Sequence, residues 1–306
     1  MHLQGKAIFN LLRKNWIEDP ALQVKPWQVE DYRILPTEEL HKRLKRLGVM
    51  ITKENFASYA EECGTPEDLT DCLWLDEEDE EGYDEAYLNI FEIWRRDFSE
   101  NPSLSIFCDE LDVRIDLYDL EDIEPLLTTL EDLLDEQVDK GLTPKEAFAF
   151  ISSYLSNDLE IFLYEYIAEQ IDLGNTLEAS EFLNGIYDYV KGNPLFAILR
   201  ARDLLLTDED AAYSLLMKIL EDLKEEELGA LFEILDLFVD GRNPSLFLNA
   251  ALQATYFIHT KEDFEEFQSI IVNFYKRSGE DKRASAFLAF SKDSIEKARF
   301  LIQEIM

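Results

Sequence analysis

The side chains that could do chemistry are concentrated in one acidic run, Asp76–Glu85, which reads DEEDEEGYDE. Alternating carboxylates followed by a glycine are typical of calcium loops. An EF-hand frame starting at Glu77 has acceptable residues at its third, fifth and sixth positions, namely Asp79, Glu81 and Gly82. It lacks aspartate at the first position and has Leu88 where a bidentate glutamate belongs. We therefore predict no metal-ligating residue here; loose divalent binding by a charged loop stays open beside a simply solvated loop.

Acid–base and nucleophilic catalysis have no recognisable signature in this chain. Because the chain has 66 Asp and Glu, pairs of carboxylates occur throughout it and do not indicate an active site. The three histidines, His2, His41 and His259, belong to no catalytic motif, and His41 beside Lys42 and Arg43 is expected to be an exposed helix residue. No glycine-rich phosphate-binding loop exists. The sequence therefore predicts a protein that is not an enzyme, with no catalytic residue, no cofactor-binding residue and no cofactor.

The three cysteines are Cys63, Cys72 and Cys108. They are odd in number and include no Cys-x-x-Cys spacing, so neither a disulfide framework nor a zinc site is predicted. We expect them to be small buried or half-buried side chains of a protein from a reducing compartment. No stretch approaches the ~20 apolar residues that span a membrane. The predicted location is therefore the cytoplasm.

The first residues predict a short amphipathic helix and not the apolar core of a signal peptide. Its expected apolar face carries Ile8, Leu11, Leu12 and Trp16. Such a helix can lie on a membrane surface. Docking of this face on the protein's own core is the preferred interpretation.

The charge is strongly uneven along the chain. The formal net charge is −37. Residues 1–60 carry 10 basic and 7 acidic side chains, residues 61–140 carry 4 and 29, and residues 141–306 carry 15 and 30. Four of the basic residues lie on one predicted helix from Thr37 to Leu47, namely Lys42, Arg43, Lys45 and Arg46. Either this basic helix docks on the acidic segment of the same chain, which we prefer, or each awaits a separate partner.

Helix start and stop signals cover most of the sequence. Predicted helices before residue 141 are interrupted by loops around Pro20, Pro26 and Pro36 and by the acidic run. The segment from Leu104 to Tyr118 has helical spacing, although its end also alternates like a strand. Arg95 and Arg96 are expected to form local ion pairs. Aromatic residues at helical spacing are expected in the core, namely Phe162, Tyr166, Phe182, Tyr187, Tyr189, Phe232, Phe238, Phe264, Phe267 and Phe274.

Beyond residue 141 the pattern becomes regular. Helix starts are predicted near residues 143, 157, 176, 193, 208, 225, 243 and 260, so pairs of helices recur every ~33–35 residues. Short loops make neighbouring helices antiparallel. This period is typical of an α-solenoid.

Residues 143–306 resemble the tetratricopeptide-like helical repeats. The resemblance is carried by small and apolar residues near the offsets of that family, namely Ile167, Ala168, Gly174, Ala179 and Ile186. The chain departs from the family pattern in lacking an aromatic residue at the first signature position and in placing Pro194 a few residues late. The resemblance implies binding of a protein or peptide on the concave face of the repeats.

Taken together, these patterns predict an all-α protein with an irregular N-terminal helical region, residues 1–140, and an α-solenoid-like array of antiparallel helix pairs, residues 141–306. We expect a non-enzymatic protein–protein interaction module, a scaffold, adaptor or chaperone-like protein, whose partner is a basic protein. Direct binding of nucleic acid or of a membrane is not expected, because the chain is so negative. The alternative is an acidic nucleic-acid mimic that occupies a DNA- or RNA-binding protein.

Overall fold

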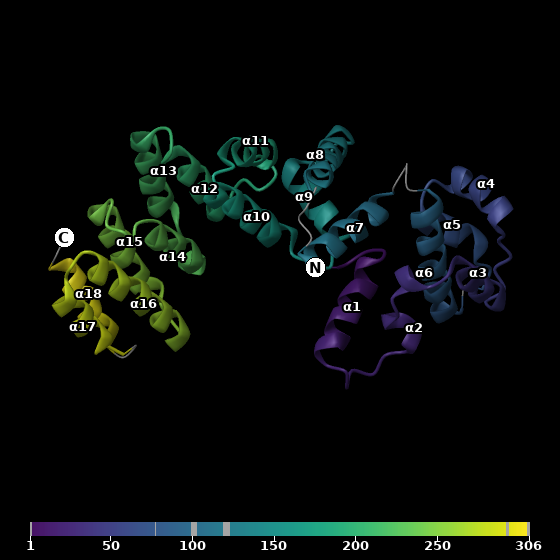
Figure 1. Ribbon diagram of the computed structural model, residues 1–306, viewed down its shortest axis with the longest axis horizontal. Coiled ribbons are helices and arrows are strands. Elements are labelled where there is room, and N and C mark those ends of the chain that lie inside the picture. Colours follow the sequence, from purple (N-terminus) through teal and green to yellow (C-terminus); the bar gives the residue numbers. More distant parts are fainter. Residues whose placement is uncertain (1, 77, 99–102, 119–122, 292–293, 305–306) are drawn as a thin grey trace. The chain divides into compact units, whose positions relative to one another are not determined.

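The computed structural model describes residues 2–76, 78–98, 103–118, 123–291 and 294–304. All regular structure within these ranges is helical, which confirms the predicted all-α fold. Contacts between residues group the chain into two compact units, unit 1 of residues 1–162 and unit 2 of residues 163–306 (Figure 1). The division falls inside helix α10 (Leu159–Leu173).

Unit 1 is built around helix α6. Ten of its 18 residues are buried, and α3, α5 and η1 pack against it. The core around it includes Phe56, Leu69, Phe91 and Trp94. The ambiguous segment after Leu104 is helix α7 throughout. The elements that complete unit 1 before α10 are α1 (Ala7–Glu18), α2 (Pro26–Val29), η1 (Tyr32–Ile34), α3 (Thr37–Arg46), α4 (Lys53–Cys63), α5 (Pro66–Leu73), α6 (Glu80–Asp97), α7 (Leu104–Leu117), α8 (Glu124–Asp139) and α9 (Pro144–Ser152).

The predicted apolar face of the first helix is wrong at two of its four positions. Helix α1 forms as expected, but Ile8 is 49% and Leu11 is 37% exposed, whereas Leu12 and Trp16 are half-buried and Ala7 and Phe9 are buried. Phe9 packs between Trp27 and Tyr87, with ring centroids 6.3 and 6.4 Å away. The polar side of the helix faces inward because its Asn10 donates hydrogen bonds to buried carboxylates of α7, as described below.

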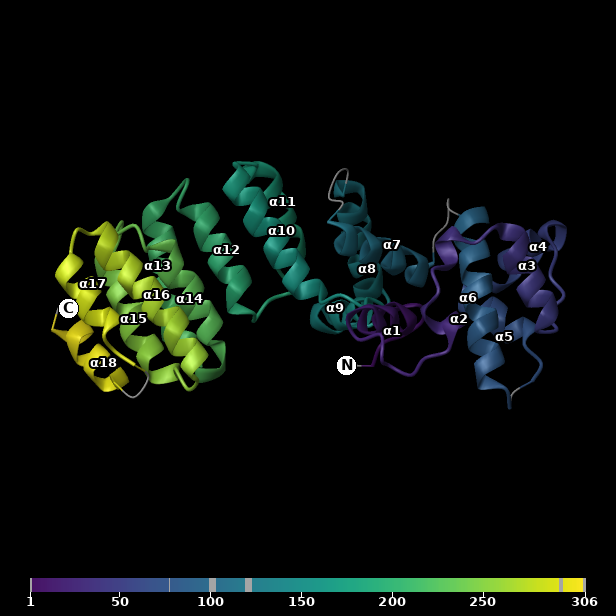
Figure 2. The same cartoon turned by 60° about the horizontal axis from the view of Figure 1, so that its bottom comes forward.

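Unit 2 continues as an array of packed helices. Sequential pairs α12/α13, α14/α15 and α16/α17 pack together, α18 packs on α15, and these helices lie side by side in Figures 1 and 2. The elements are α11 (Thr176–Ile186), α12 (Pro194–Leu204), α13 (Glu209–Asp222), η2 (Glu225–Glu227), α14 (Leu228–Leu237), α15 (Pro244–Phe257), α16 (Lys261–Arg277), α17 (Asp281–Leu288) and α18 (Ile295–Gln303). Their starts agree with the predicted ones to within about three residues.

Local capping explains this agreement. Side chains of Asn193, Asp208, Asn243 and Thr260 each accept a hydrogen bond from a backbone N–H in the first turn of the helix that follows. Helix α11 stops at Ile186, and the chain then passes through turns before α12 begins at Pro194.

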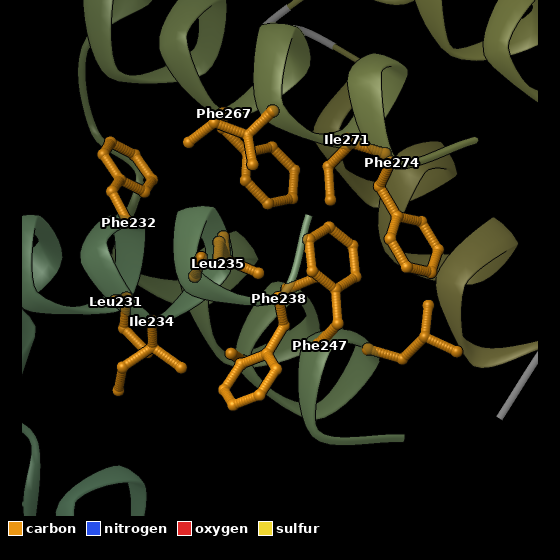
Figure 3. Close-up of a cluster of buried hydrophobic side chains, with 14 of the residues drawn as sticks. Leu231, Phe232, Ile234, Leu235, Phe238, Phe247, Phe267, Ile271 and Phe274 are labelled. Carbon is orange, nitrogen blue, oxygen red and sulfur yellow. The ribbon is translucent and has the colours of Figure 1, made fainter. Parts of the chain in front are cut away.

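Aromatic and aliphatic side chains fill the core of unit 2, and Figure 3 shows its central part. The rings of Phe247 on α15 and Phe274 on α16 stack with centroids 3.9 Å apart and planes 10° apart. Both side chains are buried. Seven of the ten aromatic residues predicted for the core are buried, five of them in this cluster, whereas Tyr166, Phe182 and Tyr187 are only half-buried.

Candidate functional site

The acidic run borders a pocket of about 540 Å³ between the end of α5 and the start of α6. We call this hollow the acidic pocket. It is lined by five carboxylates and two aromatic rings, namely Asp71, Asp76, Asp79, Glu80, Asp84, Trp74 and Tyr83. The sequence singled out the acidic run but not Asp71 or Trp74. A signal that could have found Trp74 is its place two positions before a run that itself contains the aromatic Tyr83.

The two aromatic rings are held by hydrogen bonds to their surroundings. The indole Nε1 of Trp74 donates to the Asp76 carbonyl at 2.6 Å, and the Tyr83 hydroxyl donates to Asp71 Oδ1 at 2.6 Å. The rings meet edge to face, with centroids 6.5 Å apart and an interplanar angle of 84°. Next to them, Leu75 is 92% exposed. The pocket therefore combines negative charge with fixed aromatic surface and an exposed apolar side chain.

The start of α6 forms the floor of the acidic pocket. Asp79 caps this helix, because its Oδ1 accepts a hydrogen bond from the Gly82 N–H at 2.9 Å. Gly82 is buried, and a Cβ atom placed on it would lie 2.3 Å from Asp79 Oδ2 and 2.6 Å from the Trp74 ring. Only glycine lets the cap and the indole approach the helix this closely.

Replacing Gly82 with alanine is expected to destabilise unit 1 by about 1–3 kcal/mol, because the methyl group must displace Trp74 or the Asp79 cap. Denaturant unfolding followed by tryptophan fluorescence measures this change. The matched control is Gly229→Ala in α14, where nothing lies within 4 Å of the added methyl group. There alanine should be neutral or stabilising, because it favours helix. Because all four tryptophans lie in unit 1, the effect of this control is measured by hydrogen exchange of peptides from α14. Equal stability of the Gly82→Ala variant and the wild type would contradict the packing described above.

The carboxylates of the acidic pocket lack cationic neighbours within the described part of the chain. None of the five forms an ion pair there with a described lysine, arginine or histidine, whereas the adjacent Glu81 and Glu85 pair with Lys25 and Arg46. Burial together with Glu80 and Glu81 raises the pKa of Asp84 above its ordinary value. The acidic pocket is therefore a concentration of negative charge that a cation would stabilise.

Part of the remaining charge of the acidic segment is neutralised by basic residues of the N-terminal region. Basic residues from the first 46 positions form ion pairs with carboxylates of residues 81–116, namely Lys6 with Asp109, Lys14 with Asp116, Lys25 with Glu81, Arg33 with Asp109 and Glu110, and Arg46 with Glu85. Helix α3 also packs directly on α6. Of its four basic residues, only Arg46 pairs with a described carboxylate of the acidic segment, since Lys42 and Arg43 bind Glu39 and Glu30.

Helices α1 and α7 meet through polar side chains in the interior of unit 1. Asp109 and Asp112 on α7 are 3% and 1% exposed. Asn10 Nδ2 bridges them at 2.9 and 3.3 Å, and Arg33 donates to Asp109 at 2.6 Å. Asp112 also accepts hydrogen bonds from the backbone N–H groups of Ser156 and Asn157. This network explains the orientation of α1, because buried carboxylates require donors.

The remaining candidate residues lie apart from the acidic pocket. Arg95 and Arg96 both bind the buried Glu92, which confirms the predicted local ion pairs. Arg96 also donates to the backbone carbonyls of Tyr32 and Leu35 and so ties η1 to α6. His259 is exposed and pairs with Glu225.

The prediction that His41 is exposed is wrong. The residue is half-buried, and neither ring nitrogen has solvent contact or a hydrogen-bond partner in the described structure. Its helix α3 packs against α6, so the face that carries His41 is covered in spite of the flanking charges. At the start of the same helix, the Thr37 hydroxyl accepts a hydrogen bond from Arg96 at 2.9 Å and does not cap the helix.

The described residues contain no group of three or more His, Cys, Asp or Glu side chains arranged to hold a metal ion. Glu77, the first position of the calcium-loop frame, lies outside the described residues. Among the described helices none is both long and apolar enough to cross a membrane. Comparisons with protein-family models, with curated proteins and with solved structures each found no match.

Proposed function

We propose that this chain is a non-enzymatic interaction module, a scaffold, adaptor or chaperone-like protein of the cytoplasm, that binds a basic protein partner. The acidic pocket is the contact that receives a lysine or arginine side chain of that partner. The observation that carries the proposal is the grouping of five carboxylates, unpaired with any described cationic side chain, around the rings of Trp74 and Tyr83.

The chemistry of the acidic pocket suits a cationic side chain better than a metal ion. A guanidinium or ammonium group gains from carboxylates and from the face of an indole ring together. Leu75 offers apolar contact to the aliphatic part of such a residue. The negative charge around the site would also speed the encounter with a basic partner.

Unit 2 supplies a second surface to this proposal. Its packed helix pairs recur at the spacing of tetratricopeptide-like repeats, which present extended surfaces to proteins and peptides. We propose that unit 2 contributes contacts that depend on shape, while the acidic pocket contributes contacts that depend on charge.

The test is the affinity of the full chain for a fluorescent peptide rich in lysine and arginine. The Glu80→Gln/Asp84→Asn variant removes two charges from the acidic pocket, and we expect it to bind about 5- to 30-fold more weakly, since each such charge contributes about 1 kcal/mol. Binding to the wild type should also weaken as salt rises.

The matched control removes two exposed charges elsewhere. Glu178→Gln/Glu181→Gln on α11 changes the net charge by the same amount, and we expect less than a twofold loss. Equal losses in both variants would mean that total charge alone attracts the peptide. Affinity capture at low and high salt then separates the partners: recovery of mainly nucleic-acid-binding proteins, equally with both variants, would favour the mimic of nucleic acid instead.

A further inference from the structure

The rings of Trp74 and Tyr83 form two walls of the acidic pocket that stand nearly at right angles to each other. Both rings line the pocket, and their planes make an angle of 84° with centroids 6.5 Å apart. We call these two walls the aromatic corner. A group seated in it contacts two aromatic surfaces at once. Because the face of an aromatic ring carries partial negative charge, the aromatic corner favours a cationic group.

The hydrogen-bonding groups of both rings are already bonded within the chain. The Trp74 Nε1 donates to the Asp76 carbonyl and the Tyr83 hydroxyl donates to Asp71, each at 2.6 Å. Burial and the hydrogen bond to Asp71 raise the pKa of Tyr83, so the phenol keeps its proton at neutral pH. The rings therefore offer a ligand their aromatic surface and no hydrogen-bond donor.

Two carboxylates of the acidic pocket keep their oxygens available. Glu80 and Asp84 lie one helical turn apart on α6, and neither accepts a hydrogen bond from any residue within the described ranges. The other three carboxylates each accept one from a residue nearby, namely Asp71 from Tyr83, Asp76 from the Glu78 N–H and Asp79 from the Gly82 N–H. The acidic pocket therefore holds free acceptors beside the aromatic corner.

We propose that the acidic pocket recognises a methylated lysine of the basic partner, with dimethyl-lysine as the preferred form. The inference rests on the proposed function, because it specifies which cationic side chain the acidic pocket receives. The two methyl groups pack in the aromatic corner, and the one N–H that dimethyl-lysine retains donates to Glu80 or Asp84.

The preference over unmodified lysine follows from hydration. An ammonium group is strongly hydrated and has three N–H donors, whereas the aromatic corner has no strong acceptor for those that face it. Such donors would lose water without gaining a partner. Methylation replaces two of them with apolar surface and keeps the positive charge. A third methyl group would remove the last donor to the carboxylates.

The test measures binding of the full chain to three fluorescent basic peptides of one sequence, in which a central lysine is unmodified, dimethylated or trimethylated. We expect the wild type to bind the dimethylated peptide about 5- to 20-fold more tightly than the unmodified one, with the trimethylated peptide between them. This ratio is measured on the wild type and does not depend on any variant.

Two variants of one residue assign the preference to the ring. Tyr83→Phe keeps the ring and loses only the hydroxyl, so the ratio of affinities should stay within twofold of the wild-type ratio. Tyr83→Leu removes the ring, and dimethylated and unmodified peptides should then bind within twofold of each other. Circular dichroism of both variants verifies that the helices are retained. An undiminished ratio in Tyr83→Leu would overturn the inference.

The inference and the proposed function fail in different ways. Equal binding of unmodified and dimethylated peptides to the wild type, both weakened in Glu80→Gln/Asp84→Asn, would overturn the inference and support the proposed function. Absence of binding of all three peptides would overturn both. Trimethylated peptide bound as tightly as the dimethylated one would overturn the role of the remaining N–H and thus the preference for dimethyl-lysine.

Discussion

Replacing Asp109 with alanine is expected to lower the free energy of unfolding of unit 1 by about 3 kcal/mol. The carboxylate is 3% exposed and receives Arg33 at 2.6 Å and Asn10 at 2.9 Å, with Lys6 at 3.7 Å. Its loss leaves these donors without their acceptor. The cost lies near the lower end of the range for buried pairs, because Arg33 keeps Glu110 and is 25% exposed.

The measurement is denaturant unfolding followed by tryptophan fluorescence, which reports on unit 1 because all four tryptophans precede residue 95. The matched control is Glu110→Ala, which removes the other carboxylate partner of Arg33. Glu110 is 36% exposed, so we expect a loss of less than about 1 kcal/mol. Similar losses of unfolding free energy in the two variants would contradict the prediction that the buried Asp109 stabilises unit 1 more than the exposed Glu110 does.

The same variant should change the acid stability of unit 1. Burial acts to raise the pKa of Asp109, but Lys6 and Arg33 with hydrogen bonds from Asn10 and Arg33 hold it below its ordinary value of 3.8. Its contribution to stability is therefore complete above the unfolded pKa and is lost as the pH falls through the lower folded pKa. Asp109→Ala lacks this contribution, so its stability should fall less steeply below pH 4.

The pKa of the neighbouring Asp112 is shifted in the opposite direction. Burial raises its pKa, although hydrogen bonds from Ser156 and Asn157 oppose the change. The folded state therefore keeps this proton at a pH where the unfolded chain has released it. Stability from Asp112 is greatest below the unfolded pKa and decreases as the pH rises through the folded value. Asp109 and Asp112, one helical turn apart, therefore contribute to acid stability with opposite signs.

Replacing Phe247 with alanine is expected to cost unit 2 about 3–5 kcal/mol. The ring is fully buried and stacks on Phe274 at 3.9 Å, so the change removes a large apolar side chain and the stack together and leaves a cavity (Figure 3). Hydrogen exchange of peptides from α14 to α16 measures the loss locally, as faster exchange of amides that are protected in the wild type.

The control for this prediction is Phe300→Ala on α18. Phe300 is 61% exposed, so its removal should cost less than about 1 kcal/mol. Protection of α14 to α16 should then stay within error of the wild type. Unchanged exchange in Phe247→Ala would mean that the stacked rings are not a central part of the core.

The helices of residues 143–304 could be predicted because their ends depend on neighbours in the sequence. The Thr143 hydroxyl accepts the Glu146 N–H, while the Glu146 carboxylate accepts the Thr143 N–H in return, and Thr260 forms the same box with Asp263. Such bonds connect residues three positions apart. Together with the helical spacing of apolar residues, they are legible without any tertiary contact, so the helix starts and the all-α class followed from the sequence itself.

Which side of a helix is buried was decided only by tertiary contacts. By its own pattern α1 should bury Ile8 and Leu11, yet Asp109 and Asp112, about 100 positions away, require its polar side. Likewise, packing of α3 on α6 covers His41 despite its charged neighbours. The interactions that stabilise these orientations join groups that are distant in the sequence. A local sequence pattern therefore cannot predict them.

The acidic pocket was likewise only partly predictable from the sequence. The run of carboxylates at residues 76–85 is visible in the sequence as charge and composition. Its conversion into a pocket required α5 to end at Leu73 so that Trp74 lies against Gly82 and Tyr83. The sequence by itself determined the residue types and the helices, because propensity and capping are local; the tertiary structure alone decided which side chains meet, because burial joins residues that the chain keeps apart.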